Sequence, residues 1–299
     1  MRLITRADLD GLTCAVLLAE VEPIDEIVLA HPKDVQDGKV EIRSDDILAN
    51  LPHDARAGKV FDHHVSQTET FKNAGAAKGA FAGEAPSAAR VIAGHYNSPK
   101  FAPYEDLLVE TDRLDSAQLD PEDVSDPRGW ILIGYTLDPR TGMARFRDYF
   151  AHVVELAKAH PNDPSAVLAD PQVAERVHVL RESEAAFIDH LRKTSTQQGN
   201  VVVTDARGMK NAPLGNRFLI YTLFPEVNVS VRIADGGNPS FVSIQAGHNI
   251  FNRTCKTNVG ELLARYGGGG HRGAGTAQPK TEDAERVLGE IVAELRKNG

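Results

Sequence analysis

Short apolar runs alternate with helix-forming segments through the first half of the chain. Helices are expected at Gly11–Glu20 and from Pro86 onward, and strands at Leu3–Thr5, Glu26–His31, Val40–Ile42 and Lys59–Phe61. Because strands that alternate with helices usually form a parallel sheet covered on both faces, the pattern predicts an α/β fold. Ligands of such sheets bind outside the carboxyl ends of the strands. Polar residues that follow these runs are therefore the first candidates for a functional site.

The second half of the chain predicts a separate, strand-rich unit. A charged helix is expected from Pro171 to about Thr196, and later helices at Val259–Tyr266 and from about Glu282 to Lys297. The strands expected between them are Val201–Thr204, Phe218–Tyr221, Val227–Ile233 and Phe241–Ile244. A length of 299 residues also suits two domains better than one. We expect a parallel-sheet domain at 1–165, a helical linker at 166–199 and a smaller α/β domain at 200–299.

Composition narrows the class of protein and its partners. The chain is 41% hydrophobic and 25% charged, and no apolar stretch is long enough for a membrane span. Two cysteines without CxxC spacing and no secretory pattern predict a cytoplasmic protein that binds no membrane. A net charge of −9 argues against duplex DNA as a ligand, because such binding depends on basic residues that neutralise phosphates. Small phosphate-bearing substrates are compatible with this charge.

Acidic residues and histidines gather near the expected strands. Asp8 and Asp10 follow the first run, Asp46 follows the Val40–Ile42 run, and Asp62-His63-His64 closes the Lys59–Phe61 run. All of them are expected where strands end, so the topology predicts that they come together. Carboxylate and imidazole ligands together suit Mn, Mg, Fe or Zn. Two simpler interpretations stay open, a helix cap for Asp10 and a solvated turn for the histidine pair.

A glycine run near the C-terminus is the second candidate feature. Gly267 to Gly270, including Gly268 and Gly269, precede His271 and Arg272, so backbone N–H groups and a cation could hold an anion. The alternative is a helix cap followed by a turn, although one glycine suffices for a cap. Further candidates for binding the substrate are Arg232, Asn252 and Arg253, for each of which a surface salt bridge is an equal alternative.

Five motifs in order resemble those of the DHH phosphoesterase superfamily, in the branch with a C-terminal DHH-associated domain. This branch includes nanoRNA and pAp hydrolases and exopolyphosphatase-like proteins. The motifs cover nearly the whole chain and are Arg6–Gly11, Asp46–Pro52, Asp62–His64, Glu110–Asp115 and Gly267–Ala274.

The resemblance implies a pair of divalent ions, usually Mn, with Mg as the alternative. It assigns Asp8 to one ion, Asp10 to the other, and Asp46 to a bridging position, with His63 and Asp112 completing the second ion's ligands. Two such ions can hold a water and the phosphate oxygens of an in-line displacement.

The resemblance also assigns the catalytic residues, Asp46 among them. His64 would face the scissile phosphate and Asp62 would orient the imidazoles. Two departures are visible: Arg6 stands in a motif where many relatives carry a further histidine ligand, and Asp115 competes with Asp112 as a ligand. Arg6 cannot bind a metal ion, so it either weakens that metal site or contacts the phosphate.

These observations predict a Mn-dependent phosphoesterase for short single-stranded oligonucleotides or pAp-like nucleotides, bound in the cleft between the two domains. Inorganic polyphosphate is the alternative substrate, although it would need an extended positive channel. The competing class of protein is a non-catalytic nucleotide or phosphate sensor with a degraded metal site. The missing histidine favours that class, whereas the complete set of carboxylates and the histidine pair argue against it.

Overall fold

The computed structural model describes residues 1–73, 78–137, 147–209, 213, 215–237 and 239–297. The chain divides into two compact units. Unit 1 comprises Met1–Gln118 and Asp126–Leu180, and unit 2 comprises Leu119–Ser125 and Arg181–Gly299. The division falls inside the long helix α10 (Pro171–Thr194), which the sequence predicts as a connecting helix. None of the described helices combines the length and the apolar character that a membrane span requires.

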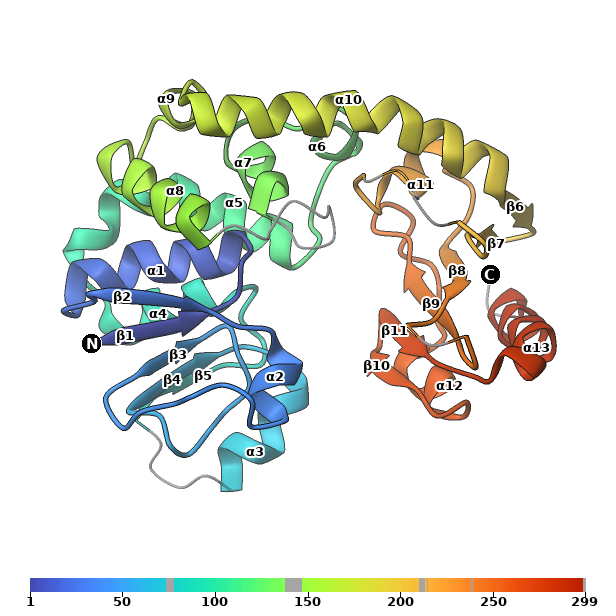
Figure 1. The fold of residues 1–299 in the computed structure, drawn as a ribbon, viewed down its shortest axis with the longest axis horizontal. Helices are drawn as coiled ribbons and strands as arrows, with labels where there is room; N and C mark the ends of the chain where they lie inside the picture. Colours follow the sequence, from blue (N-terminus) through green and yellow to red (C-terminus); the bar gives the residue numbers. More distant parts are fainter. Residues whose placement is uncertain (74–77, 138–146, 210–212, 214, 238, 298–299) are drawn as a thin grey trace. The chain divides into compact units, whose positions relative to one another are not determined.

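Unit 1 is built on a parallel five-stranded sheet with the order β2-β1-β3-β4-β5, as predicted (Figure 1). Its strands are β1 (Arg2–Thr5), β2 (Glu26–Leu29), β3 (Ile47–Ala49), β4 (Lys59–Asp62) and β5 (Gly79–Phe81). The carboxyl ends of β1, β3 and β4 therefore meet at one edge of the sheet, and the residues that follow them are neighbours in space.

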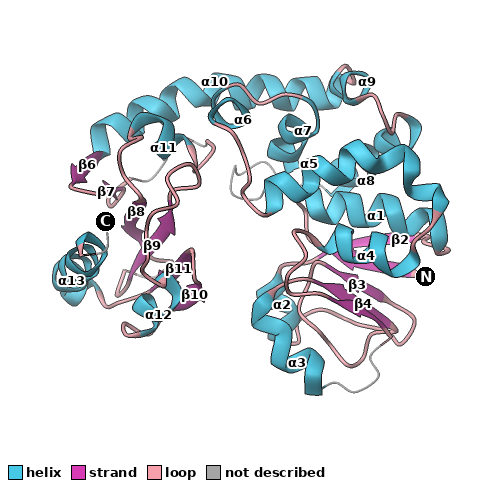
Figure 2. Ribbon diagram, turned by 180° about the vertical axis from the view of Figure 1, so that it is seen from behind, coloured by secondary structure: helices cyan, strands magenta, loops and turns pink. Residues whose placement is uncertain are grey.

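Helices cover both faces of this sheet, because alternate strand residues point to opposite sides. Leu3 and Phe61 pack with α1 (Leu9–Val21) and α4 (Ala88–Tyr96), whereas Ile4 and Val60 pack on the other face with α2 and α3. Figure 2 shows the same two layers. The other helical segments are α2 (Pro32–Gln36), η1 (Val65–Gln67), α3 (Thr68–Asn73), η2 (Pro99–Tyr104), α5 (Glu105–Asp115), α7 (Gly129–Leu137), α8 (Arg147–Ala159) and α9 (Pro164–Leu168).

One expected strand of unit 1 is wrong. Val40–Ile42 forms no strand, and the third strand in sequence is β3 instead. Ile47 and Leu48 of β3 are fully buried between β1 and β4, so they carry the apolar pattern of a central strand. Consequently Asp46 precedes a strand rather than following one.

Unit 2 contains a mixed six-stranded sheet with the order β10-β11-β9-β8-β7-β6. Only β7 and β8 run parallel among the paired strands, and the other neighbours are antiparallel. The strands are β6 (Ser195–Gln198), β7 (Val201–Asp205), β8 (Val229–Asp235), β9 (Val242–His248), β10 (Gly269–His271) and β11 (Ala274–Ala277).

One face of this sheet buries Val229, Val231 and Ile233 against α12 (Val259–Ala264) and α13 (Ala284–Arg296). The other helices described in this unit are α6 (Pro121–Ser125), α11 (Leu219–Leu223) and η4 (Thr281–Asp283). The expected strand at Phe218–Tyr221 is wrong, because these residues enter α11. A short apolar run carries no period that separates a buried helix from a strand.

Candidate metal site and anion-binding residues

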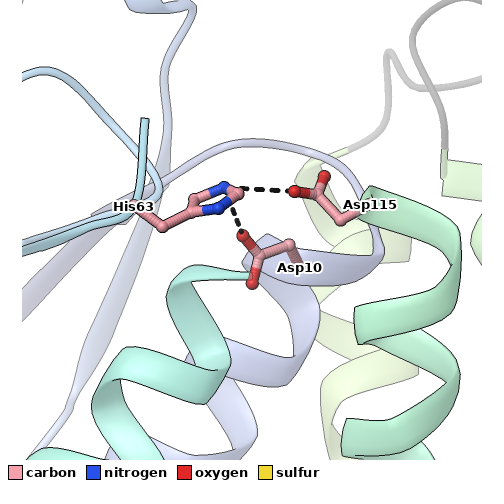
Figure 3. Close-up of side chains that lie close together, drawn as sticks. All are labelled: Asp10, His63 and Asp115. Carbon is pink, nitrogen blue, oxygen red and sulfur yellow. Dashed lines mark ion pairs between the residues drawn. The ribbon is translucent and has the colours of Figure 1, made fainter. Parts of the chain in front are cut away.

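Three side chains from different elements converge at the carboxyl edge of the unit 1 sheet (Figure 3). Asp10 lies in the first turn of α1, His63 follows β4, and Asp115 is the last residue of α5. His63 Nε2 lies 3.1 Å from Asp115 Oδ2 and 3.8 Å from Asp10 Oδ2. No described acceptor is aligned for a hydrogen bond with the buried Nε2 atom. The Asp10–His63–Asp115 cluster thus points three ligand atoms at one position.

Asp10 is fixed by the N-terminus of α4. Its carboxylate accepts hydrogen bonds from the backbone N–H groups of Ala88 (2.9 Å) and Ala89 (2.8 Å). Burial, followed by the charge of Asp115, raises the pKa of Asp10. The Asp10 carboxylate is therefore fixed in position by α4. It is not the N-cap of α1, because Asp8 caps that helix by accepting a hydrogen bond from the Gly11 N–H group.

His63 is oriented by a backbone carbonyl. Its Nδ1 atom lies 3.1 Å from the carbonyl oxygen of Ala85, so Nδ1–H donates there and Nε2 faces the carboxylates. Metal-binding histidines are commonly oriented in this way. Although burial opposes the charged form, the nearby Asp115 and Asp10 carboxylates raise the pKa of His63 to about 9. The cluster therefore attracts a positive charge, either a proton or a cation.

Asp62 and His64 form a second imidazole–carboxylate pair. His64 Nδ1 lies 2.7 Å from Asp62 Oδ1, and the Asp62 side chain is completely buried. The His64 side chain is 27% exposed. Asp62 therefore orients His64, as expected, whereas the hydrogen-bond partner of His63 is Ala85.

The fourth motif contributes Asp115 rather than Asp112. Asp112 accepts hydrogen bonds from Ser87 Oγ (2.6 Å) and Arg90 Nε (2.7 Å). Both aspartates lie on α5, but only Asp115, at the C-terminal end of the helix, reaches His63. The structure thus groups Asp115, and not the expected Asp112, with Asp10 and His63, and we take Asp115 as the candidate ligand.

Asp46 lies away from this edge of the sheet. It precedes β3, at the end where Arg2 begins β1, and its buried carboxylate accepts from Arg2 Nε (2.9 Å) and Nη2 (2.7 Å). The backbone N–H group of Arg43 donates a further 2.7 Å bond. In a parallel sheet this is the edge opposite Asp10 and His63. The expected position of Asp46 beside Asp10 and His63 is therefore wrong, because the strand expected before it does not form, and its bridging role finds no support in this arrangement.

Asn50 also lies at the carboxyl edge, although the sequence pattern predicted no role for it there. It follows β3 at the carboxyl edge, is completely buried, and adopts a left-handed backbone conformation with φ of 57°. Its Nδ2 atom donates a 3.0 Å hydrogen bond to Asp8 Oδ1, and its Oδ1 atom has no described partner. Asn50 thus stands at the edge where Asp46 was expected. The following Leu51-Pro52 was the one available signal that a strand ends there.

Arg6 lies beside Asp8. The Nε atom of Arg6 is 3.2 Å from Asp8 Oδ2, while Asp8 Oδ1 accepts from Gly11 N–H at 2.9 Å and from Asn50. Both oxygens of Asp8 are therefore engaged by donors of the protein itself.

In unit 2, Arg232 is the candidate anion-binding residue whose charge is most affected by burial. It lies on β8, paired with Thr204 and Gln245 of the adjacent strands, on the face opposite Val231. Burial lowers the pKa of this half-buried guanidinium, and the described residues supply it with no ion pair. A half-buried cation without an acidic partner is suited to bind an anion.

Much of the glycine run is explained by packing within the unit. A Cβ atom at Gly268 would lie 2.2 Å from the carbonyl oxygen of Thr276, and one at Gly270 would lie 2.3 Å from that of Ala274. Gly267 has φ of 75° just beyond α12. Only at Gly269 in this run would a Cβ atom meet open space without a strained φ. The second half of the run, Gly269 and Gly270, enters the hairpin strand β10, which the sequence pattern did not predict.

Two of the other candidate substrate-binding residues of unit 2 bond to loop backbone, and two are exposed on the surface. Asn252 donates its side-chain amide to the backbone carbonyl of Val227 (3.3 Å), and Arg253 Nε donates to Ile250 (3.0 Å). His271 and Arg272 are exposed on the hairpin, where Arg272 Nη2 is 3.4 Å from the Lys256 carbonyl. Asn252 therefore acts in loop structure, whereas His271 and Arg272 remain accessible to solvent.

The parallel α/β fold carries a cluster of three side chains that could hold a metal ion, and the chain belongs to the DHH phosphoesterase superfamily. It is 38% identical to the pGpG-specific phosphodiesterase PggH from Vibrio cholerae, with a TM-score of 0.82, over 100% of this chain and 99% of that one. The DHH domain of a member of a family of ribosomal proteins has the same fold at 13% identity and a TM-score of 0.59, covering 99% of this chain and 87% of that domain. Neither a protein-family model nor a curated protein matches the chain.

Proposed function

We propose that this protein is a metal-dependent phosphodiesterase that hydrolyses short oligonucleotides, with linear dinucleotides such as pGpG as its preferred substrates. The observation that carries the proposal is the Asp10–His63–Asp115 cluster at the carboxyl edge of the sheet. The full-length similarity to PggH, a protein described as pGpG-specific, supports the choice of substrate. The reaction adds water across one phosphodiester bond and converts pGpG into two molecules of GMP.

The donors of the cluster fit a divalent ion. Two carboxylates and one imidazole nitrogen suit Mn or Mg, and Asp10 and His63 are already oriented by backbone groups. An ion bound there would lower the pKa of its bound water below that of free water and so favour hydroxide as the nucleophile. Asp10, His63 and Asp115 would hold that ion.

His64 is the candidate for moving a proton. Asp62 fixes the proton on Nδ1, so Nε2 is the nitrogen that exchanges a proton with the substrate. We assign His64 to protonation of the leaving oxygen and Asp62 to its orientation. Such a general acid contributes typically about 10²- to 10⁴-fold to the rate.

Unit 2 would contribute an anion-binding residue. Arg232 can donate two parallel hydrogen bonds to a phosphate group, and its lack of an acidic partner among the described residues leaves its charge available. The exposed His271 and Arg272 are further donors of this unit.

The test is hydrolysis of a matched panel in the presence of Mn: pGpG, a 5-mer RNA, pAp, a cyclic dinucleotide and inorganic polyphosphate. We expect GMP from pGpG, with activity lost on chelation and in Asp10→Asn. Asp106→Asn is the control, because Asp106 is an exposed carboxylate on α5. Release of phosphate from polyphosphate alone would favour the exopolyphosphatase alternative. Tight binding of pGpG without turnover would favour the alternative that the protein is a non-catalytic sensor.

A further inference from the structure

The residues around Asp8 do not match the ligands that a second metal ion needs. A two-ion site requires carboxylates or imidazoles that reach a second position about 3.5–4 Å from the first ion. Within the described residues, one group of three ligand atoms meets, and it is the Asp10–His63–Asp115 cluster. Asp46 is held by Arg2 at the opposite edge of the sheet.

Both oxygens of Asp8 are contacted by donors of the protein. Gly11 N–H and Asn50 Nδ2 donate to Oδ1, and Arg6 Nε lies 3.2 Å from Oδ2. The Gly11 contact caps α1, so it belongs to the helix and is retained whatever binds nearby. Asn50 supplies a neutral amide at the carboxyl end of β3, which adds no negative charge to attract a cation.

Arg6 brings a permanent positive charge to the same place. A guanidinium carries no lone pair that can bind a metal ion, and it stays protonated at all working pH values. It can, however, hold two oxygens of a phosphate group through parallel N–H groups. The Arg6 side chain is 29% exposed, so it is accessible to a ligand while it contacts Asp8.

We propose that this chain binds a single divalent ion, at the Asp10–His63–Asp115 cluster, and that Arg6 supplies the second positive charge on the substrate phosphate. The inference rests on the proposed function for its substrate but not for the number of ions. Asp8 and Asn50 then act as positioning residues: Asp8 holds the guanidinium, and Asn50 holds Asp8 from its left-handed position after β3.

The first measurement is the number of Mn ions per chain, by elemental analysis after equilibrium dialysis, together with the electron paramagnetic resonance spectrum. We expect one ion per chain, the spectrum of an isolated Mn ion, and loss of the ion in Asp115→Asn. Two ions per chain with a spin-coupled spectrum would overturn the inference. Because this count needs no turnover, it is decided separately from the proposed function.

The second measurement uses Arg6→Gln and the product GMP as the probe. We expect Arg6→Gln to keep one Mn per chain with an affinity within threefold of the unchanged protein, and to bind GMP at least about tenfold more weakly. Arg6→Lys should restore part of the GMP affinity, because it returns the charge without the bidentate geometry. Unchanged GMP binding by Arg6→Gln would remove Arg6 from the phosphate site. One Mn per chain with no hydrolysis of any substrate would refute the proposed function alone.

Discussion

Ser87 Oγ lies 2.6 Å from Asp112 Oδ1, and this hydrogen bond joins the start of α4 to the last turns of α5. Arg90, one turn into α4, reinforces the connection through Asp112 Oδ2. Since the first turn of α4 holds Asp10 and the end of α5 carries Asp115, Asp112 sets the spacing of the two carboxylates that converge on His63.

Substitutions at Asp112 and Asp115 should therefore differ in kind. We expect Asp115→Asn to weaken Mn binding by more than about 100-fold, because it removes a ligand, and Asp112→Asn to weaken it by less than about tenfold. Asp112→Asn should instead lower the free energy of unfolding by about 1–3 kcal/mol through the lost Arg90 pairing. Mn titration and denaturant unfolding of both variants measure the two effects. Equal losses of Mn affinity would restore Asp112 as a ligand.

Asp46 should matter for stability and not for metal binding. Asp46→Ala leaves Arg2 without its carboxylate partner, so it should lower the free energy of unfolding. The folded fraction should keep its Mn content and its rate of pGpG hydrolysis. Urea unfolding and activity at low temperature separate the two quantities, with Asp45→Ala as the exposed neighbouring control. A folded Asp46→Ala protein that binds no Mn would contradict this placement.

The metal-free protein should lose stability as the pH rises above neutrality. The pKa of His63 is raised from its ordinary value of 6.5 to about 9, so the charged imidazole stabilises the fold below pH 6.5. This stabilisation falls between pH 6.5 and 9 and amounts to about 3 kcal/mol at most. We expect the Tm of the chelated protein to fall over that range. His63→Asn should show a flatter profile over the same range, and identical slopes would remove His63 as the titrating group.

Arg232 should lower the stability of the fold and strengthen substrate binding. A half-buried guanidinium without an acidic partner among the described residues costs free energy in the folded state, so Arg232→Met should raise the Tm. The same substitution should raise the KM for pGpG at least about tenfold, a loss of about 1.4 kcal/mol, while leaving the Mn content unchanged. A Tm scan and steady-state kinetics measure both effects. A lower Tm with an unchanged KM would indicate a purely structural role.

The parallel sheet of unit 1 was predictable, because β1 and β4 are apolar runs that end in charged motifs. The identity of the middle strand was not. Val40–Ile42 and Ile47–Ala49 are both short and apolar, and only the pairing of Leu3 with Ile47 decides between them. Because Ile47–Ala49 is the strand, Asp46 lies before it, at the edge opposite His63, and Asn50 lies after it, at the same edge as His63. The misplaced strand therefore put Asp46 at the wrong edge and left Asn50 unrecognised.

Helical spacing likewise left Asp112 and Asp115 undecided. Residues three apart share one face of a helix, and the sequence does not state where that helix ends relative to His63. The glycine run shows the complementary difficulty. Its close contacts are with Thr276 and Ala274, which follow it in sequence but reach it only after the hairpin has formed.

The two N–H groups that hold Asp10 have a consequence for how the protein is assembled. With its carboxylate already bonded to Ala88 and Ala89, and with a proton on His63 balancing the charge of Asp115, the cluster is electrostatically satisfied without an ion. Under the proposed function, folding and metal loading are therefore separable events. The chain would complete its fold first and then exchange a proton for a divalent ion, so the supply of metal would control activity without controlling the amount of folded protein.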